Sequence, residues 1–485
     1  MPDGATLQQR SFAHAVRHAR LPIDKLWLDY FALGGEAGPL EVEAYYHGLT
    51  ELTAAQRDML AHTVNEWLDE LSGNHRATYS RIVRETRPRT PPLTALVDLL
   101  EDSELTPPDG LAAVAEKAAA ALGVRLTIYL ADYEQRALHP LPQDGTTTEG
   151  MSLGIETTLP GRVYQQVRML TAEGDPPRLW VPLLDGAERL GVFAVEVDDV
   201  HDLYDPGLRA QCRWLAMLLG HLVTLASQFG DGFDRVRLRK RRSTAGELIW
   251  SLLPPLTAGV DSFVVSAVLE PRYDVGGDVF DYALSETTAA LLILDAMGHD
   301  LHSGLIAATA LAAHRAARHD GADLVEQTRA MDHAIADQFG RHSGFATAVL
   351  AELDLSTGRL RYVNAGHPPP LLMRGGKIGR TLTGGRRIPL GLGPTSLTVG
   401  EETLQTEDWL VLHTDGISEA RDRTGRFFGE HRLVDFLRRE AAAGHPPPET
   451  ARRLINAVLT HQNGELQDDA TVLLARWTSA GGLTS

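Results

Sequence analysis

Only one cysteine, Cys212, occurs in the 485 residues of the chain. A single cysteine excludes an intrachain disulfide framework and a zinc site made of cysteine ligands. Cys212 lies in an apolar stretch with helical periodicity, CRWLAMLLGHLVTL, and this setting favours a buried core residue over a nucleophile.

Long apolar segments and excess positive charge are missing as well. The first residues, MPDGATLQQRSF, hold no apolar signal-peptide core, and no stretch reaches 18 uninterrupted apolar residues. We therefore expect a cytoplasmic protein. The 46 Lys and Arg residues stand against 64 Asp and Glu, a formal net charge of −18. This balance argues against a general nucleic-acid or membrane-surface binder.

The length predicts a multidomain protein, and its first part, residues 1–85, has an all-helical pattern. Apolar residues recur at helical spacing over 26–33, 41–49 and 54–71. These stretches predict a small helical regulatory domain with aromatic residues in its core. A docking module for an upstream activator is the alternative, and the residues do not identify such a partner.

A proline-containing linker, residues 86–108, surrounds one short predicted helix at 93–100. The pattern then alternates between helix and strand: an Ala-rich helix at 111–122 precedes the strand VRLTIYLAD, and LWVPLLDGAERLGVFAVEVDD predicts a hairpin. Over residues 109–226 this layout resembles a GAF domain, a small α/β sensor fold.

The pattern of residues 205–254 predicts a long helical stretch with one interruption at 230–232. Residues 227–256 are assigned as a helical connector to the domain that follows. Leucines spaced three and four residues apart predict a parallel helix pair and hence a homodimer. These leucines are Leu215, Leu218, Leu219, Leu222 and Leu225. The basic run RVRLRKRRS at 235–243 is either a solvated helix face or a salt-sensitive contact. Pro254 and Pro255 are expected to end the connector.

Four aspartates in the second half of the chain lie at the ends of predicted buried strands. They are Asp278 in VGGDVFD, Asp295 in LLILDAMGHD, Asp415 in LVLHTDG and Asp469 in QDDATVLL. One such aspartate would most simply cap its own turn. Four of them in one domain predict a site for hard divalent cations, which prefer carboxylate oxygens.

The motifs around these aspartates resemble a known family. VGGDVFD, DAMGHD, FATAVLAELD, NAGHPPPLL, the LGL at 390–392, HTDGISEAR and DDATVLL occur in the order seen in SpoIIE-type Ser/Thr phosphatases, a bacterial branch of the protein phosphatase 2C superfamily. The resemblance implies a phosphatase domain at 257–478. It also implies an α/β sandwich of two antiparallel sheets flanked by helices, binding two Mn2+ or Mg2+ ions.

The resemblance also implies roles for individual residues. Asp295 would bridge the two ions, the backbone carbonyl of Ala296 would complete one site, and Asp415 and Asp469 would bind the second ion. Asp278 would hold water molecules of the cluster or bind an ion itself. Asp468 competes with Asp469, which is preferred because it directly precedes ATVLL.

Two histidines keep two interpretations each, and one threonine has a single expected position. His299 is a structural residue or a general acid, although it stands four residues past Asp295. His367, before three prolines, fixes a rigid turn or contacts the substrate. Thr347 is expected to point inward from its strand.

By resemblance the substrate is a small phosphorylated regulatory protein, an anti-sigma-factor antagonist. The N-terminal domains would control its dephosphorylation through the helical connector. The alternative is a catalytically silent phosphatase fold that binds or senses a phosphoprotein. The presence of all four aspartates favours the active enzyme.

Overall fold

The computed structural model describes residues 4–70, 90–142, 152–270, 276–298, 300–340, 344–393 and 396–478. The chain divides into two compact units. Unit 1 comprises Met1–Ala131, Arg136–Asp185 and Leu190–Arg237, and unit 2 comprises Asp132–Gln135, Gly186–Arg189 and Leu238–Ser485. Within the described stretches, no helix has both the length and the apolar character needed to cross a membrane.

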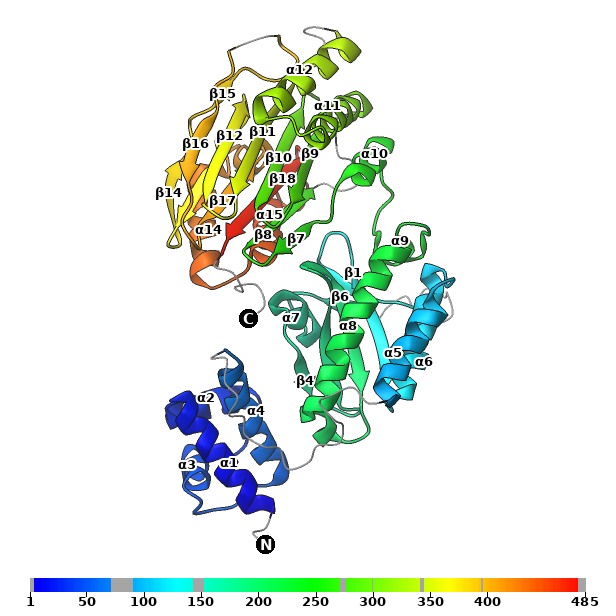
Figure 1. The fold of residues 1–485 in the computed structure, drawn as a ribbon, viewed down its shortest axis with the longest axis vertical. Coiled ribbons are helices and arrows are strands. Elements are labelled where there is room, and N and C mark those ends of the chain that lie inside the picture. Colours follow the sequence, from blue (N-terminus) through cyan, green and yellow to red (C-terminus); the bar gives the residue numbers. More distant parts are fainter. Residues whose placement is uncertain are drawn as a thin grey trace. The chain divides into compact units, whose positions relative to one another are not determined.

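Unit 1 begins with four helices (Figure 1): α1 (Gly4–Ala19), α2 (Ile23–Ala32), α3 (Pro39–Tyr46) and α4 (Ala54–Glu70). The last three confirm the predicted helical stretches. Tyr30 and Tyr45 are buried in the core as expected, whereas Phe31 is 59% exposed. Helix α1 was not predicted. Its sequence is polar on average but amphipathic, and Phe12 and Val16 on its apolar side belong to the core of unit 1.

The rest of unit 1 is an α/β arrangement around one sheet with the strand order β3-β2-β1-β6-β5-β4. The helices are α5 (Thr90–Ser103), α6 (Leu111–Ala121), α7 (Leu159–Gln166), α8 (Pro206–Ala226) and α9 (Gly232–Arg237). The strands are β1 (Arg125–Ala131), β2 (Ala137–Pro140), β3 (Leu153–Gly154), β4 (Leu170–Ala172), β5 (Arg178–Asp185) and β6 (Glu188–Glu196). The predicted β5–β6 hairpin is confirmed, whereas the GAF resemblance stays a prediction.

The predicted helix at 93–100 is longer in the structure. Helix α5 begins at Thr90 and contains two prolines in its first turn, where a missing backbone N–H costs no intrahelical hydrogen bond.

The helical stretch predicted at 205–254 is interrupted twice, so the prediction of a single interruption is wrong. Residues 227–231 separate α8 from α9, and residues 238–243 separate α9 from α10 (Thr244–Leu252). The second break coincides with four consecutive basic residues, whose charges repel one another in a helix. Ser243 then begins α10 by accepting a hydrogen bond from the backbone of Gly246.

The leucine stripe of α8 is already partly occupied within unit 1. Leu215 and Leu219 are buried, and α8 packs on β5. Leu218 and Leu222 are half-buried, while Leu225 is 55% exposed. Cys212 on the same helix is buried, as expected. A dimer through this helix stays a prediction and would use the side that β5 leaves open.

Unit 2 is a sandwich of two sheets, which confirms the architecture expected for residues 257–478. One sheet has the order β15-β12-β11-β10-β9, with β16 paired to β12, and the other has the order β14-β13-β17-β18-β8-β7. Among the described residues, β12 and β15 pair in parallel, and the other paired strands of both sheets are antiparallel. The inner faces of both sheets share one apolar core. Its buried residues include Leu292 and Leu294 from one sheet and Leu473 from the other.

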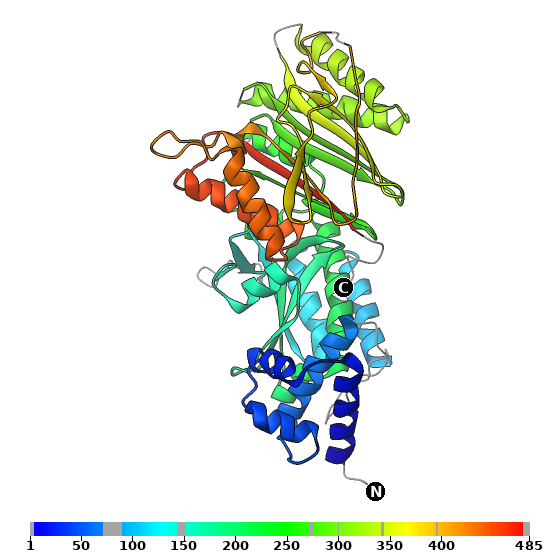
Figure 2. The ribbon, with the colours of Figure 1, turned by 90° about the vertical axis from the view of Figure 1, so that its left-hand side faces the viewer.

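Four helices cover the two outer faces of the sandwich. Helices α11 (Leu301–His319) and α12 (Leu324–Phe339) lie on one side, and α14 (Gly429–Ala442) and α15 (Pro447–His461) lie on the other (Figures 1 and 2). The strands are β7 (Thr257–Val260), β8 (Phe263–Glu270), β9 (Asp278–Leu284), β10 (Thr288–Ala296), β11 (Ala346–Asp354), β12 (Arg359–Ala365), β13 (Leu371–Arg374), β14 (Lys377–Thr381), β15 (Arg386–Arg387), β16 (Gly400–Thr403), β17 (Trp409–His413) and β18 (Ala470–Trp477). As predicted, the connector ends before Pro254 and Pro255.

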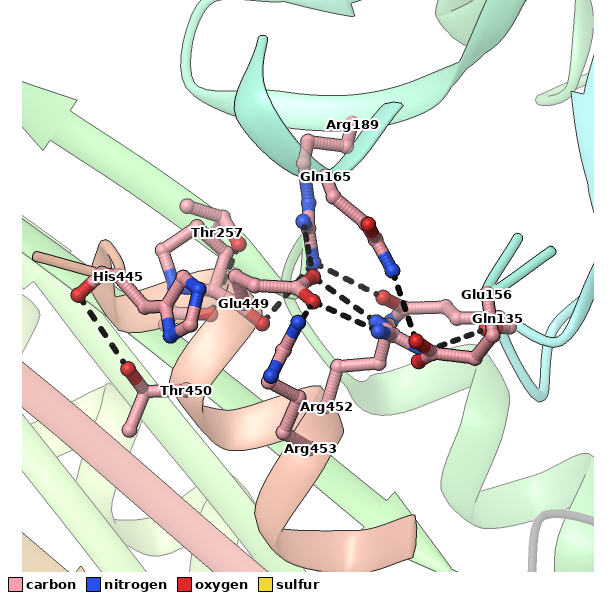
Figure 3. Close-up of polar contacts among 12 residues, drawn as sticks. Gln135, Glu156, Gln165, Arg189, Thr257, His445, Glu449, Thr450, Arg452 and Arg453 are labelled. Atoms are coloured by element: carbon pink, nitrogen blue, oxygen red, sulfur yellow. Dashed lines mark hydrogen bonds and ion pairs between the residues drawn. The ribbon is translucent and has the colours of Figure 1, made fainter. Parts of the chain in front are cut away.

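A buried ion-pair cluster lies at the start of α15, within unit 2 (Figure 3). The carboxylate of Glu449 is fully buried and accepts hydrogen bonds from Arg452 at 2.6 and 2.9 Å and from Arg453 at 2.8 Å. Arg189, from the segment Gly186–Arg189 of the same unit, donates to Glu449 at 3.0 Å and to the carbonyl of Pro448 at 2.9 Å. Three guanidinium groups thus compensate one buried carboxylate.

We expect Glu449→Gln to destabilise the protein at pH 7 by about 3 kcal/mol. Burial alone would raise the pKa of Glu449, but Arg452, Arg189 and Arg453 outweigh it and lower the pKa to about 2. Because the folded-state pKa is depressed, this stabilisation is full above the unfolded-state pKa and is lost as the pH falls toward 2.

Urea unfolding at pH 7 and pH 4 measures this effect, and the difference between wild type and variant should shrink at pH 4. The matched control is Glu401→Gln, which removes an exposed ion pair with Arg359 and should cost less than about 0.5 kcal/mol. Equal losses in the two variants would contradict the role given to the buried cluster.

Candidate metal centre

The four predicted aspartates come together at one end of the sandwich. Asp278 begins β9, and Asp295 is the second-last residue of β10. Asp415 begins the short helix α13 (Asp415–Ser418) after β17, and Asp469 directly precedes β18. Two therefore come from each sheet. Within the first sheet, Asp278 and Asp295 are direct partners in the strand register.

Hydrogen bonds join the two sheets at this point. Asp278 accepts from the hydroxyl of Thr414 at 2.8 Å and from that of Thr471 at 2.6 Å. Asp469 accepts from the backbone N–H groups of Gly276 at 2.8 Å and Gly277 at 3.0 Å. All of these atoms are buried. Asp278, at the start of β9, is held by two threonines of the second sheet, and Asp469, just before β18, is held by the glycines that precede β9. Thr414 and Thr471 lie within the motifs HTDGISEAR and DDATVLL, but the sequence analysis gave a role only to the aspartates of these motifs.

Two glycines allow the backbone segments of the site to approach closely. A Cβ atom on Gly277 would lie 2.3 Å from the carbonyl oxygen of Ala296, and one on Gly416 would lie 1.8 Å from the carbonyl oxygen of Asp469. Separations below 3 Å do not occur for real Cβ atoms, so these positions require glycine. The glycine after Asp415 therefore determines how close the strands that carry Asp415 and Asp469 can come.

Burial and mutual repulsion raise the pKa of all four aspartates. Burial raises the pKa of Asp295 to about 7, helped by the charges of Asp415, Asp468 and Asp469. Burial, followed by the charges of Asp295 and Asp469, raises the pKa of Asp278 well above its usual value. The pKa values of Asp415 and Asp469 are raised mainly by burial. The negative charges of these carboxylates therefore oppose one another within the cluster.

Asp468 belongs to this cluster too. It is exposed, and its charge contributes to the raised pKa values of Asp295, Asp415 and Asp469. One of its carboxylate oxygens accepts the backbone N–H of Asp469 at 2.9 Å. Asp469, in contrast, is buried and already bonded to two glycine N–H groups. In the sequence, Asp468 was considered as a metal ligand only because it is adjacent to Asp469, and Asp469 was preferred.

The residues of the cluster fit divalent cations in donor type and charge. Carboxylate oxygens are hard ligands suited to Mg2+ and Mn2+. Within the described ranges, Asp278, Asp295, Asp415, Asp468 and Asp469 form no ion pair with Arg or Lys. In the same ranges, no group of three or more His, Cys, Asp or Glu side chains is arranged to hold a metal ion by itself.

The other polar residues singled out in the sequence have separate positions. His299 lies outside the described residues. Asp300 caps α11 by accepting hydrogen bonds from the backbone of His302 and Ser303. The side chain of Asn364 bonds to both the N–H and the carbonyl of His367, so His367 is part of a rigid turn as predicted.

Comparison with known proteins agrees with the sequence motifs. Residues 285–478 match the family model described as stage II sporulation protein E (SpoIIE). Protein IcfG of Synechocystis sp. is 26% identical over 281 residues, which cover 52% of this chain and 43% of that protein. The phosphoserine phosphatase RsbP of Bacillus subtilis is 28% identical over 166 residues, covering 33% and 40% of the two chains.

Among solved structures, the RsbU and RsbW domains of Rv1364c from Mycobacterium tuberculosis are 25% identical to this chain, with a TM-score of 0.41. The match covers 46% of this chain and 63% of that one. The chain spans less than half the length of the two curated relatives it matches. The similarity to the SpoIIE family applies to the C-terminal half.

Proposed function

Because the C-terminal half is a SpoIIE-family domain of the protein phosphatase 2C type, we propose that this protein hydrolyses phosphoserine or phosphothreonine in a regulatory phosphoprotein. The observation that carries the proposal is the group of carboxylates between the two sheets, whose charge the described residues leave unbalanced. An anionic phosphate needs such a site to be neutralised before it can enter.

Divalent ions bound there would neutralise phosphoryl oxygens and lower the pKa of a water molecule. We assign Asp295 as the bridging ligand, with Ala296 contributing its carbonyl, and Asp415 and Asp469 as ligands of the second ion. Asp278, fixed by two threonine hydroxyls, is assigned to the ions or their water molecules. The exposed carboxylate of Asp468 is a further candidate ligand, which the sequence alone ranked second.

We propose a phosphorylated anti-sigma-factor antagonist in the cytoplasm as the substrate, as the resemblance to this family implies. The relative RsbP is itself named a phosphoserine phosphatase. The N-terminal unit would set the rate through the connector, with an upstream activator bound to helices α1–α4.

The test is hydrolysis of para-nitrophenyl phosphate and of a phosphoserine peptide by the full chain. We expect turnover with Mn2+ or Mg2+ and only background turnover with a chelator, because the carboxylates alone repel the substrate. Binding of a phosphoprotein without turnover under any of these conditions would instead support the catalytically silent alternative.

Dimerisation through α8 is part of the proposal and gives a separate prediction. The half-buried Leu218 and Leu222, with the exposed Leu225, form an apolar strip that a second copy would cover. Light scattering on the full chain should therefore give the mass of a dimer. A monomer at tens of micromolar would reject this part and would leave α8 with a packing role inside unit 1.

A further inference from the structure

A row of polar residues crosses the first sheet at the metal centre. Asp278 on β9 pairs with Asp295 on β10, and Asp295 pairs in turn with Thr347 on β11. Residues directly opposite each other on antiparallel strands point to the same face. Since Asp278 bonds to Thr414 and Thr471 of the opposite sheet, this face is the inner one. Thr347 thus extends the row of aspartates by one position.

The hydroxyl of Thr347 is held by a buried histidine. Its oxygen lies 2.8 Å from Nδ1 of His367. His367 is 1% exposed, and Asn364 fixes its backbone by accepting its N–H at 2.9 Å and donating to its carbonyl at 3.0 Å. Because His367 is buried and its backbone is fixed, its ring holds the hydroxyl of Thr347 in one orientation. The NAGH turn therefore ends in a contact with the strand that neighbours Asp295.

The environment of His367 indicates which partner donates the proton. Burial and the charge of His413 lower the pKa of His367 to about 3, so the ring is neutral and carries one N–H. The backbone of His413 acts in the opposite direction on this pKa. Nδ1 lies beside the hydroxyl of Thr347, and we assign the proton of the neutral ring to Nε2, which leaves Nδ1 as an acceptor.

With this tautomer, Thr347 donates its hydroxyl proton to Nδ1. A hydroxyl has one donor and two acceptor positions, so only lone pairs remain for the cleft. The neighbouring Asp295 is also an acceptor when ionised. Two acceptors side by side attract a donor between them, and a water molecule on a divalent cation is a strong donor.

We propose that Thr347, held by His367, is a positioning residue that orients a water molecule of the metal centre next to Asp295. This inference rests on the proposed function. It gives the NAGH motif a task in addition to its turn, because His367 acts on the reaction through Thr347 without touching the substrate.

Two pairs of variants test the idea on the full chain. Thr347→Val removes the hydroxyl with little change of shape, and Thr347→Ser restores it. His367→Gln loses the nitrogen at the Nδ1 position, whereas His367→Asn places an amide atom there. We expect Thr347→Val and His367→Gln to lower kcat about tenfold, with KM changed less than about twofold. Thr347→Ser and His367→Asn should stay near the wild type.

Binding of Mn2+, measured by titration calorimetry without substrate, separates positioning of water from loss of the ion. We expect the Kd for Mn2+ to stay within about twofold in all four variants, because Thr347 is not a ligand. The electron paramagnetic resonance spectrum of bound Mn2+ should change in Thr347→Val and not in Thr347→Ser. Thermal unfolding checks that each variant is folded.

Equal kcat values for Thr347→Val and Thr347→Ser would overturn the inference, and so would a Kd for Mn2+ that rises as much as kcat falls. Both results require a wild type that binds Mn2+ and turns over substrate. A wild type that does neither would overturn the proposed function itself, and the inference with it.

Discussion

Replacing Asp295 by asparagine is expected to reduce phosphatase turnover by at least about 1000-fold and, in the absence of metal, to make the protein more stable. The pKa of Asp295 is raised to about 7 by burial and by neighbouring carboxylates. Because the folded-state pKa lies above the unfolded-state value, the ionised carboxylate costs stability at higher pH. A neutral amide removes this cost, on the order of 2 kcal/mol at pH 8.

The order of stability should reverse when Mn2+ is added, because only the wild type then gains the binding free energy of the ions. Thermal unfolding at pH 8, in chelator and in Mn2+, measures both halves of the prediction. Asp435→Asn, an exposed change on α14, is the control and should alter neither stability nor turnover. Full turnover in Asp295→Asn, or the same order of stability in both conditions, would refute the assignment of Asp295.

Gly416→Ala is expected to lower turnover by at least about 100-fold and to destabilise the protein by about 3 kcal/mol. The added Cβ would lie 1.8 Å from the carbonyl oxygen of Asp469, which belongs to the backbone and has no flexible side chain to move away. Asp415 and Asp469 would have to separate. The two carboxylates assigned to one ion would then no longer reach it together.

Urea unfolding and turnover of para-nitrophenyl phosphate measure the two effects of Gly416→Ala. Excess Mn2+ should not restore turnover, since the defect is a displaced backbone and not a weak ligand. Gly174→Ala is the matched control, because no atom lies within 4 Å of the Cβ it adds. Wild-type turnover in Gly416→Ala would show that the close approach of these segments is not needed for activity.

The sequence by itself predicted the parts of this protein that depend on local pattern. Helices α2, α3, α4 and α6 and the β5–β6 hairpin follow from apolar periodicity, and the structure confirms them. The aspartates could be found because each stands at the end of a strand, in a motif that resembles one family. The prediction omitted helix α1 and the break at 238–243, because it singled out no apolar stretch before residue 26 and placed the basic run 235–243 within a continuous helix.

Only the tertiary structure decided which groups hold those aspartates. Thr414 and Thr471 reach Asp278 from positions 136 and 193 residues away in the chain, and Arg189 reaches Glu449 from 260 residues away. Such partners are chosen by strand register and sheet packing, which a single sequence does not encode in any local spacing. The sequence preferred Asp469 over Asp468 from its place before ATVLL, but only folding shows that Asp469 is buried against glycine N–H groups while Asp468 stays exposed.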